Sequence, residues 1–376
     1  MRILLVGEYS RLHNSLKEGL EALQHEVSII ATGDNFKKFP VDYSIHPKFF
    51  LENKFLVFCN KVLFRIFKTD LQLAEKGILF WFFLPKLKNY DVVQLINSNA
   101  IETYPFFSKY LLKKLFNQNK KSFLLVCGED TPVIDFLLKD EVKYSILTPL
   151  LQNKKLASNY RFSLKYTRKN YRDLYDFVSK KVSKIMVSDF DYKIALPEKT
   201  LIPNPVNKDK ITFQATAVFD KVIIFLGKNN SSAIKKGTVF FEEAVSIIQK
   251  KYGSKVDIIK VEDVPYNEYI ALYNQSHILL DQVYGYDQGY NALEAMAKGK
   301  VVFTGAEDEF TAHYNLTERV CVNAIPDIDY LVNELSFLIE NPDEIEAIGK
   351  RARAFIEQEH DYIKITQKYL DAWNLK

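Results

Sequence analysis

Cysteine is scarce in this chain of 376 residues: there are three, Cys59, Cys127 and Cys321, and they lie far apart. One of them must stay unpaired, and none has the CxxC spacing that is typical of zinc ligands or redox-active thiols. We therefore expect buried thiols in a reducing compartment.

Long apolar runs are also missing. No stretch approaches the roughly 18 consecutive apolar residues that a membrane-spanning helix needs, and the most apolar run, 78–84, is bounded by Lys76 and Lys86. The apolar start, Met1–Gly7, is too short for a signal peptide and lacks a small-residue cleavage site. We expect it to be the first strand of a cytoplasmic protein that does not cross a membrane.

The excess of one charge sign is small. Lys and Arg number 51 against 47 Asp and Glu, which gives a formal net charge of +4. No zinc-finger or RNA-recognition signature accompanies this charge, so we expect no nucleic-acid partner. Hydrophobic residues make up 47% and charged residues 26%, which is the composition of a globular protein.

What the sequence does contain is two series of alternating strands and helices. Strands are predicted at 3–6, 27–30, 91–96 and 122–127 in the first half, and at 221–226, 255–260, 278–280 and 300–303 in the second. Those at 91–96 and 122–127 are almost wholly apolar. Helical patterns follow at 12–23 and 241–250. Such alternation is typical of parallel sheets covered by helices on both faces. We predict an α/β fold of two doubly wound, Rossmann-like domains that face a cleft.

The segment Ile202–Asn207 lies between the two series and contains Pro203 and Pro205. Prolines disfavour helix and stiffen the backbone, as expected at a domain junction. We predict an N-terminal domain at 1–205 and a C-terminal domain at 206–359. A final helix at about 360–376 is expected to pack back on the first domain.

The most informative stretch is Asp287–Phe303, where a glycine turn leads into a helix and then into a buried strand. A helix N-terminus exposes unpaired amides and the positive end of the dipole, so the turn of Gly289, Tyr290 and Asn291 suits a diphosphate. Glu294 follows about one turn later, within reach of a ribose attached to it. The alternative is that Gly289 is only a turn and Glu294 only a charge favoured by the dipole.

A second constellation is basic. Lys228 ends a predicted strand, and Lys235 and Lys236 precede a helix. Positive charges on neighbouring loops suit a diphosphate whose negative charge grows as a sugar departs. Each lysine taken alone is better explained as a solvated loop residue. The loop 261–269 between these motifs is a candidate for holding a base, or a plain connection between a strand and a helix.

These motifs resemble the donor site of GT-B glycosyltransferases of family 4, in which a Glu-Gly-Phe-Gly turn precedes Leu-Glu-Ala-Met-Ala; this chain has Leu-Glu-Ala-Met-Ala at 293–297. The resemblance spans nearly the whole chain and is greatest to the bacterial branch involved in surface polysaccharides. It implies a retaining transfer from a nucleotide diphosphate sugar, without metal or cofactor. Glu294 would bind the ribose, and Lys228 and Lys236 the diphosphate.

The chain departs from that family at one position. The family has an earlier Glu eight residues before the second, and here that position is Tyr286. Because the earlier carboxylate usually contacts the transferred sugar, the adjacent Asp287 is our candidate replacement.

The acceptor side is predicted at two strand ends of the first half. One is Gly7, Glu8 and Tyr9 with His13 beyond, and the other is the loop that contains Glu129 and Asp130. In a doubly wound fold these loops lie at the ligand-binding edge of the sheet. Either acid is a candidate to contact the sugar or the acceptor. Turn and helix-start roles explain the same residues equally well.

The expected partners are a nucleotide-sugar donor and a saccharide or lipid-linked acceptor. Residues 48–68 and 106–121 mix aromatics with lysines, which suits contact with the inner face of a membrane, or equally an amphipathic helix that faces a core. Three rivals remain: a nucleotide-sugar epimerase of the same fold, a degenerate sugar-nucleotide binding protein, and a nicotinamide dehydrogenase. The missing Gly-x-Gly-x-x-Gly fingerprint argues against the last.

Overall fold

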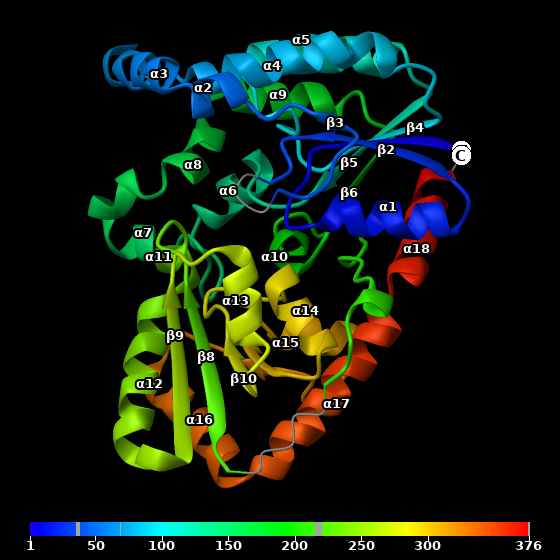
Figure 1. Cartoon of the computed structure of the whole chain (residues 1–376). Coiled ribbons are helices and arrows are strands. Elements are labelled where there is room, and N and C mark those ends of the chain that lie inside the picture. The colour runs from blue at the N-terminus through cyan, green and yellow to red at the C-terminus, as the bar shows by residue number, and fades with distance from the viewer. Residues whose placement is uncertain (35–37, 68, 215–219, 375–376) are drawn as a thin grey trace.

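A computed structural model describes residues 1–34, 38–67, 69–214 and 220–374 of the chain. It contains two parallel β-sheets, one built from each half of the sequence (Figure 1). The first has seven strands in the order β3-β2-β1-β4-β5-β6-β7, and the second has five in the order β12-β11-β10-β8-β9. The α/β class and the doubly wound arrangement agree with the prediction.

The first half is built from the following elements. Its strands are β1 (Arg2–Val6), β2 (Glu26–Ala31), β3 (Tyr43–Ser44), β4 (Val92–Leu95), β5 (Lys121–Val126), β6 (Lys184–Val187) and β7 (Thr200–Leu201). Its helices are α1 (Leu12–Ala22), α2 (Lys48–Glu52), α3 (Lys54–Phe67), α4 (Leu71–Phe83), α5 (Pro105–Asn117), α6 (Thr131–Leu137), α7 (Thr148–Gln152), α8 (Arg161–Leu164), α9 (Lys169–Ser179) and α10 (Phe190–Lys193).

The second half follows the same plan. Its strands are β8 (Val222–Lys228), β9 (Val256–Glu262), β10 (Ile278–Leu280), β11 (Val301–Thr304) and β12 (Val322–Asn323). Its helices are α11 (Ala233–Lys236), α12 (Thr238–Tyr252), α13 (Tyr266–Tyr273), α14 (Tyr290–Ala297), α15 (Asp308–His313), α16 (Ile328–Glu340), α17 (Pro342–Glu359) and α18 (Tyr362–Asn374).

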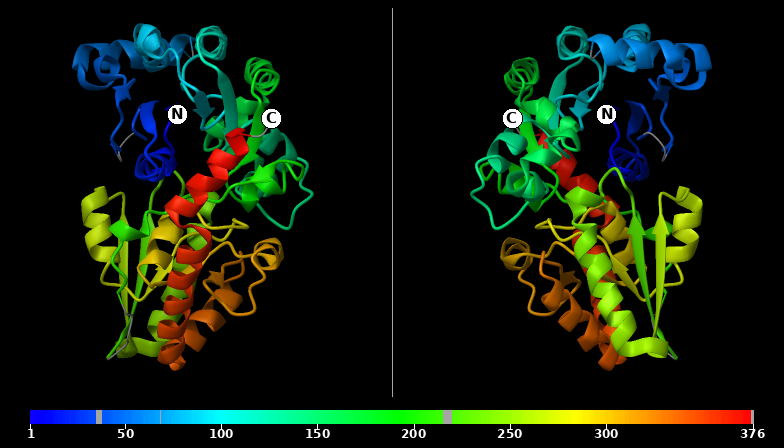
Figure 2. Two further views of the ribbon diagram at one scale, coloured as in Figure 1. Left: turned by 90° about the vertical axis from the view of Figure 1, so that its right-hand side faces the viewer. Right: turned by 90° about the vertical axis from the view of Figure 1, so that its left-hand side faces the viewer.

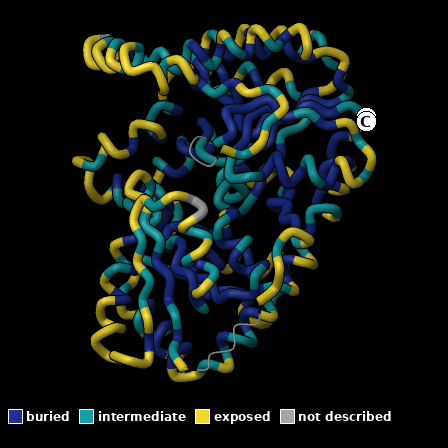
Figure 3. The backbone as a smooth tube through the Cα atoms, viewed as in Figure 1, coloured by how far each residue is buried: buried dark blue, intermediate teal, exposed yellow. Residues whose placement is uncertain are grey.

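The central strands of both sheets are buried on both faces. All four residues of β4 and all of β10 and β11 are buried, which is why these segments are apolar without a polar alternation. Each sheet lies over its own hydrophobic core. Figure 3 shows the buried strands in dark blue and the exposed outer helices in yellow.

The last helix returns to the first half of the molecule, as Figure 1 shows by its red colour beside α1. The indole Nε1 of Trp373 donates to Gln94 Oε1 at 3.0 Å, and this pair is buried under the first sheet. The predicted domain junction, 202–207, lies against the break between α17 and α18, because Val206 N donates to His360 O at 2.7 Å. Residues 375–376 of the expected helix lie outside the described residues.

Two expectations from the sequence concern the cysteines and membrane-spanning helices. All three cysteines are free, but only Cys321 is buried; Cys59 and Cys127 are partly exposed to solvent. In the part of the chain that the structure describes, none of the helices combines the length and the apolarity that a membrane span requires.

Candidate functional site

Two adjoining cavities open between the halves, at the carboxyl ends of the strands of both sheets. Their volumes are about 760 Å³ and about 460 Å³. They share a wall made of Ser10, Asp34, Lys236, Gln282, Gly289 and Tyr290. Ligands of open α/β sheets bind at this edge, because the loops there are free to vary while the strands stay fixed.

The smaller cavity is lined by every residue that the sequence analysis predicted to bind the donor. These are Lys228, Lys236, Gly289, Tyr290, Asn291 and Glu294. Lys228 ends β8 and Lys236 ends the next helix, α11, whereas the other four lie at Gly289 and in α14, much later in the sequence. The loop 261–269 also reaches this cavity through Val261, Asp263, Val264 and Tyr269, whereas the side chains of Tyr266 and Asn267 are not among those described.

The start of α14 is open toward this cavity. Gly289 is the cap residue, with φ −75° and ψ 169°, and no described side chain caps the helix. A Cβ built on Gly289 would meet no described heavy atom within 4 Å. The amides of the first turn have no acceptor within their own helix, so they carry the positive end of the dipole into the cavity.

Tyr290 contributes its backbone rather than its ring. Its hydroxyl donates to Pro205 O at 2.7 Å, and the side chain is buried between the two halves. Tyr290 therefore anchors α14 to the predicted domain junction.

Asp281 is a residue that the sequence analysis missed. It follows β10 directly, its side chain is almost fully buried, and its Oδ1 accepts from Lys236 Nζ at 2.8 Å and from Asn291 Nδ2 at 3.1 Å. One carboxylate thus holds both a candidate lysine and a candidate asparagine in place. The signal was available, because a polar residue immediately after a buried strand lies at the ligand-binding edge.

A close backbone approach positions Lys236. Gly237 ends α11 with φ 65°, and an added Cβ would lie 2.4 Å from Val283 Cγ2. Only glycine adopts this conformation without strain at such a distance. Lys228, the other candidate cation, is partly exposed and pairs with Glu242 at 2.9 Å, and this ion pair raises its pKa.

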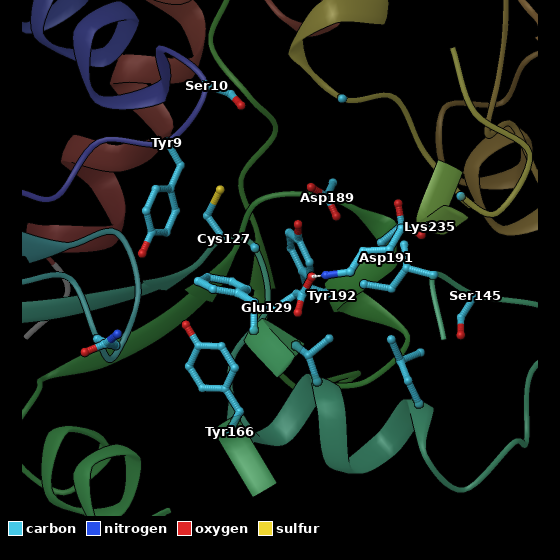
Figure 4. Close-up of a pocket in the computed structure, with 18 of the residues that line it drawn as sticks. Tyr9, Ser10, Cys127, Glu129, Ser145, Tyr166, Asp189, Asp191, Tyr192 and Lys235 are labelled. Carbon is cyan, nitrogen blue, oxygen red and sulfur yellow. Dashed lines mark hydrogen bonds and ion pairs between the residues drawn. The ribbon is translucent and has the colours of Figure 1, made fainter. Parts of the chain in front are cut away.

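The larger cavity has aromatic walls and mixed charges (Figure 4). Glu129, predicted on the acceptor side, forms an ion pair across the two halves with Lys235, the lysine that was not assigned to the diphosphate. The Glu129 Oε2 atom is buried and accepts no hydrogen bond from the described residues. Lys165 lies 3.6 Å from the centroid of the Phe162 ring, and burial lowers its pKa to about 8.

Three acids gather where the halves meet. Phe190 N donates to Asp287 Oδ2 at 3.0 Å, and Tyr286 N donates to Asp191 Oδ1 at 2.9 Å. Burial raises the pKa of Asp191 to about 7 and that of Asp287 to about 6, and it raises the pKa of Asp189 well above its usual value. Among the described residues, no group of three or more His, Cys, Asp or Glu side chains could hold a metal ion.

The comparisons with known proteins bear on this geometry. Residues 238–371 match the family model described as glycosyl transferase-like. This stretch includes Asp281 and the whole of α14, though not Lys228 or Lys236.

Several solved structures resemble the whole chain. Sucrose-phosphate synthase from Thermosynechococcus elongatus is 15% identical with a TM-score of 0.59, and the match covers 99% of this chain and 98% of that one. HepE from Anabaena, solved with UDP-glucose, is 13% identical with a TM-score of 0.58, covering 99% of both chains. An α-glucosyltransferase solved with UDP and DNA is 11% identical with a TM-score of 0.59, covering 100% and 99%. These likenesses establish the GT-B fold, and no curated protein matches the sequence.

Within the GT-B fold, Tyr286 and Asp287 have different surroundings. Tyr286 lines the larger cavity, at the position where the resemblance expected a carboxylate. Asp287 is buried behind the walls of both cavities, and its two oxygens accept from Phe190 N and from Gln288 N at 2.7 Å. In this structure Asp287 fastens α10 to the second half of the molecule, and its carboxylate oxygens are engaged by these backbone amides.

Three acceptor-side candidates are occupied by local contacts. Asp130 caps α6 and accepts from Ser98 N at 2.9 Å. Glu8 accepts from Asn14 N at 2.8 Å, and burial raises its pKa to about 7. His13 contacts Gly7 O at 2.7 Å through Nδ1, and burial lowers its pKa to about 4.

The other two acceptor-side candidates, Gly7 and Tyr9, differ from each other in position. Gly7 has φ 86°, and an added Cβ would lie 2.5 Å from Ile96 Cγ2, so glycine is required where β1 meets β4. Tyr9, by contrast, lines the larger cavity together with Glu129. The structure therefore brings Tyr9 and Glu129 to the cavity, and it places Glu8, His13 and Asp130 in the supporting structure.

Proposed function

We propose that this protein is a glycosyltransferase that transfers a sugar from a nucleotide diphosphate sugar, which binds in the smaller cavity. The observation that carries the proposal is the meeting of six nominated residues at one cavity edge, with Asp281 holding two of them. The structural relative HepE was solved with UDP and with UDP-glucose, which makes a uridine donor the first to test.

The proposed roles follow from charge and position. The amides at the start of α14, with Lys228 and Lys236, stabilise the diphosphate as negative charge develops on it. These fixed positive groups supply the stabilisation that other enzymes obtain from a metal ion, so we propose a metal-independent reaction without cofactor. Glu294 accepts from the ribose hydroxyls, and the loop 261–269 lies along the base.

The acceptor is placed in the larger cavity. Aromatic rings offer apolar faces on which a saccharide packs, and the carboxylate of Glu129 lies there to accept the proton of an attacking hydroxyl. Closure of the two halves would exclude water from the transfer. We propose a retaining reaction of family 4 type on a saccharide or lipid-linked acceptor, in the cytoplasm, within surface polysaccharide or glycoconjugate synthesis.

The first test is a thermal-shift screen of the purified chain against nucleoside diphosphates and their sugars, because a ligand of the folded state raises the melting temperature. Release of the nucleoside diphosphate from the stabilising donor, dependent on an added acceptor, is the expected second result. If no nucleotide shifts the melting temperature, the donor site is wrongly assigned.

One observation favours a second candidate, a degenerate sugar-nucleotide binding protein. Tyr286 lies at the cavity where the family has a carboxylate, and Asp287 is engaged elsewhere. Donor binding without transfer or hydrolysis across many acceptors would support that candidate, and conversion of the donor sugar without any acceptor would support an epimerase.

A further inference from the structure

Exposed apolar side chains are concentrated on one part of the surface. Twelve of the eighteen large apolar side chains exposed in the described part of the chain lie on α2, α3, α4 and α5. They are Phe49, Leu51, Phe55, Phe58, Val62, Phe64, Ile66, Ile78, Trp81, Phe82, Phe106 and Tyr110. Isolated exposed residues need no explanation, but such a concentration marks an interaction site.

The helix α3 makes little use of its apolar residues within the fold. It is attached through polar contacts: Asn60 Nδ2 donates to Asp70 Oδ1 at 3.0 Å, and Leu71 N donates to Asn60 Oδ1 at 2.7 Å. Meanwhile Phe55 is 71% exposed and Phe58 63% exposed. A helix that is apolar on most sides is normally buried, so α3 lacks its partner here.

The two basic aromatic segments predicted from the sequence therefore differ. The helix α5 turns Leu111, Leu112 and Leu115 into the core, as the core-facing alternative required. The helix α3 does not, and Lys68 at the end of its segment lies outside the described residues.

The same four helices carry the positive charge of the protein. They contain eight lysines and arginines and two glutamates, a net charge of +6, whereas the whole chain has only +4. Lysines interleaved with aromatic residues are the signature of helices that lie in the headgroup region of anionic membranes. A second copy of the chain fits poorly, because a symmetric dimer would place one basic face against another.

The arrangement in space agrees with a planar partner. Figures 1 and 2 show α2, α3, α4 and α5 together at the end of the molecule away from the second sheet. Between α4 and α5 lies a groove of about 600 Å³, which is lined by Trp81, Phe82, Leu84, Pro85, Lys114, Asn117 and Gln118. An aromatic wall beside a lysine suits the phosphate and the upper chain of a lipid.

We propose that the outer faces of α2, α3, α4 and α5, the basic aromatic face, dock this protein on a bilayer that contains anionic phospholipid. The fourteen residues of α3 extend about 21 Å, so the helix lies along the bilayer surface. Phe49, Phe55 and Phe58 insert among the acyl chains, and the lysines contact lipid phosphates. Docking is independent of the donor site, which faces the interior of the cleft.

The test is co-sedimentation of the full chain with vesicles of phosphatidylcholine, alone or mixed with phosphatidylglycerol. We expect binding to the mixed vesicles only, weakened by added salt. The double variant Phe55→Ser/Phe58→Ser should bind at least about tenfold more weakly, because each inserted ring contributes apolar burial. The variant Lys54→Glu/Lys61→Glu should also lose binding.

The matched control is Val239→Ser/Phe337→Ser, which removes two exposed apolar side chains from α12 and α16 and should bind as the wild type does. Melting temperature and nucleotide-induced thermal shift should be unchanged in all three variants, which separates this proposal from the donor assignment. Equal binding to neutral vesicles, or none to the mixed ones, would overturn the proposal. A concentration-dependent dimer that Phe55→Ser/Phe58→Ser abolishes would overturn it too, in favour of a second copy.

Discussion

A methyl group at position 289 tests the donor site with little disturbance of the fold. Gly289 has φ −75° and ψ 169°, a conformation that any L-residue adopts, and the added Cβ meets no described atom within 4 Å. Alanine is a slightly poorer N-cap residue than glycine, so Gly289→Ala loses about 0.5 kcal/mol of stability at the start of α14. Alanine also lowers the conformational entropy of the unfolded chain, which offsets this loss by about 0.4–1 kcal/mol. We expect the free energy of unfolding to change by less than about 0.5 kcal/mol.

Binding should change far more, because the methyl group occupies the space in front of the first amides of α14. A hydrogen bond to a charged group contributes about 1.5–3 kcal/mol, and every 1.4 kcal/mol is about tenfold in affinity. If a diphosphate loses one such bond, its dissociation constant rises about 10- to 100-fold. Calorimetric titration with UDP, beside thermal unfolding of the free protein, measures both quantities.

Gly253→Ala is the matched control. An added Cβ there also meets nothing within 4 Å of the described atoms, but φ is 53° and the residue lies outside both cavities. This variant should lose about 1 kcal/mol or more of stability through backbone strain and bind UDP normally. The reasoning fails if Gly289→Ala binds UDP as the wild type does, or if it is destabilised as much as Gly253→Ala.

Three further outcomes are expected. Lys236→Ala and Glu294→Ala should each abolish donor turnover in the acceptor-dependent assay, and full activity in both would contradict the assigned roles. Glu129→Gln should lower turnover without weakening the calorimetric affinity for the donor; a weakened affinity would move Glu129 to the donor side. Burial raises the pKa of Asp287 to about 6, so the folded state holds this proton more tightly than the unfolded chain and the wild type loses stability as pH rises through that value. The melting temperature of Asp287→Asn should therefore rise relative to that of the wild type as the pH increases from about 4 to 6. If the difference between the two melting temperatures does not change with pH, burial does not raise the pKa of Asp287.

The sequence predicted the long buried strands well. The predicted starts of β1, β8 and β11 lie within one residue of the observed ones, because a strand covered on both faces must be largely apolar. The short edge strands β3, β7 and β12 were missed. Each has two residues, too few for any periodicity to be visible.

The donor side was more predictable than the acceptor side for a physical reason. Gly289 and Glu294 belong to one local motif, so their relative placement follows from the geometry of a single helix start. Glu8 and His13 also follow a strand, but their partners, Asn14 and Gln94, decide whether the side chains face the cavity or the interior. The orientation of such a side chain depends on contacts between elements that are distant in the chain, and a single sequence does not reveal those contacts.

The ion pair between Lys235 and Glu129 joins residues that are 106 positions apart, and both residues line the larger cavity. Lys235 is adjacent to Lys236 on α11, so a diphosphate held by Lys236 would also attract its neighbour. Because a lysine that approaches the diphosphate interacts less with its carboxylate, donor binding would release Glu129 toward the acceptor cavity. Because Lys235 of this pair is next to Lys236, which lines both cavities, donor binding has a direct physical route to the acceptor side.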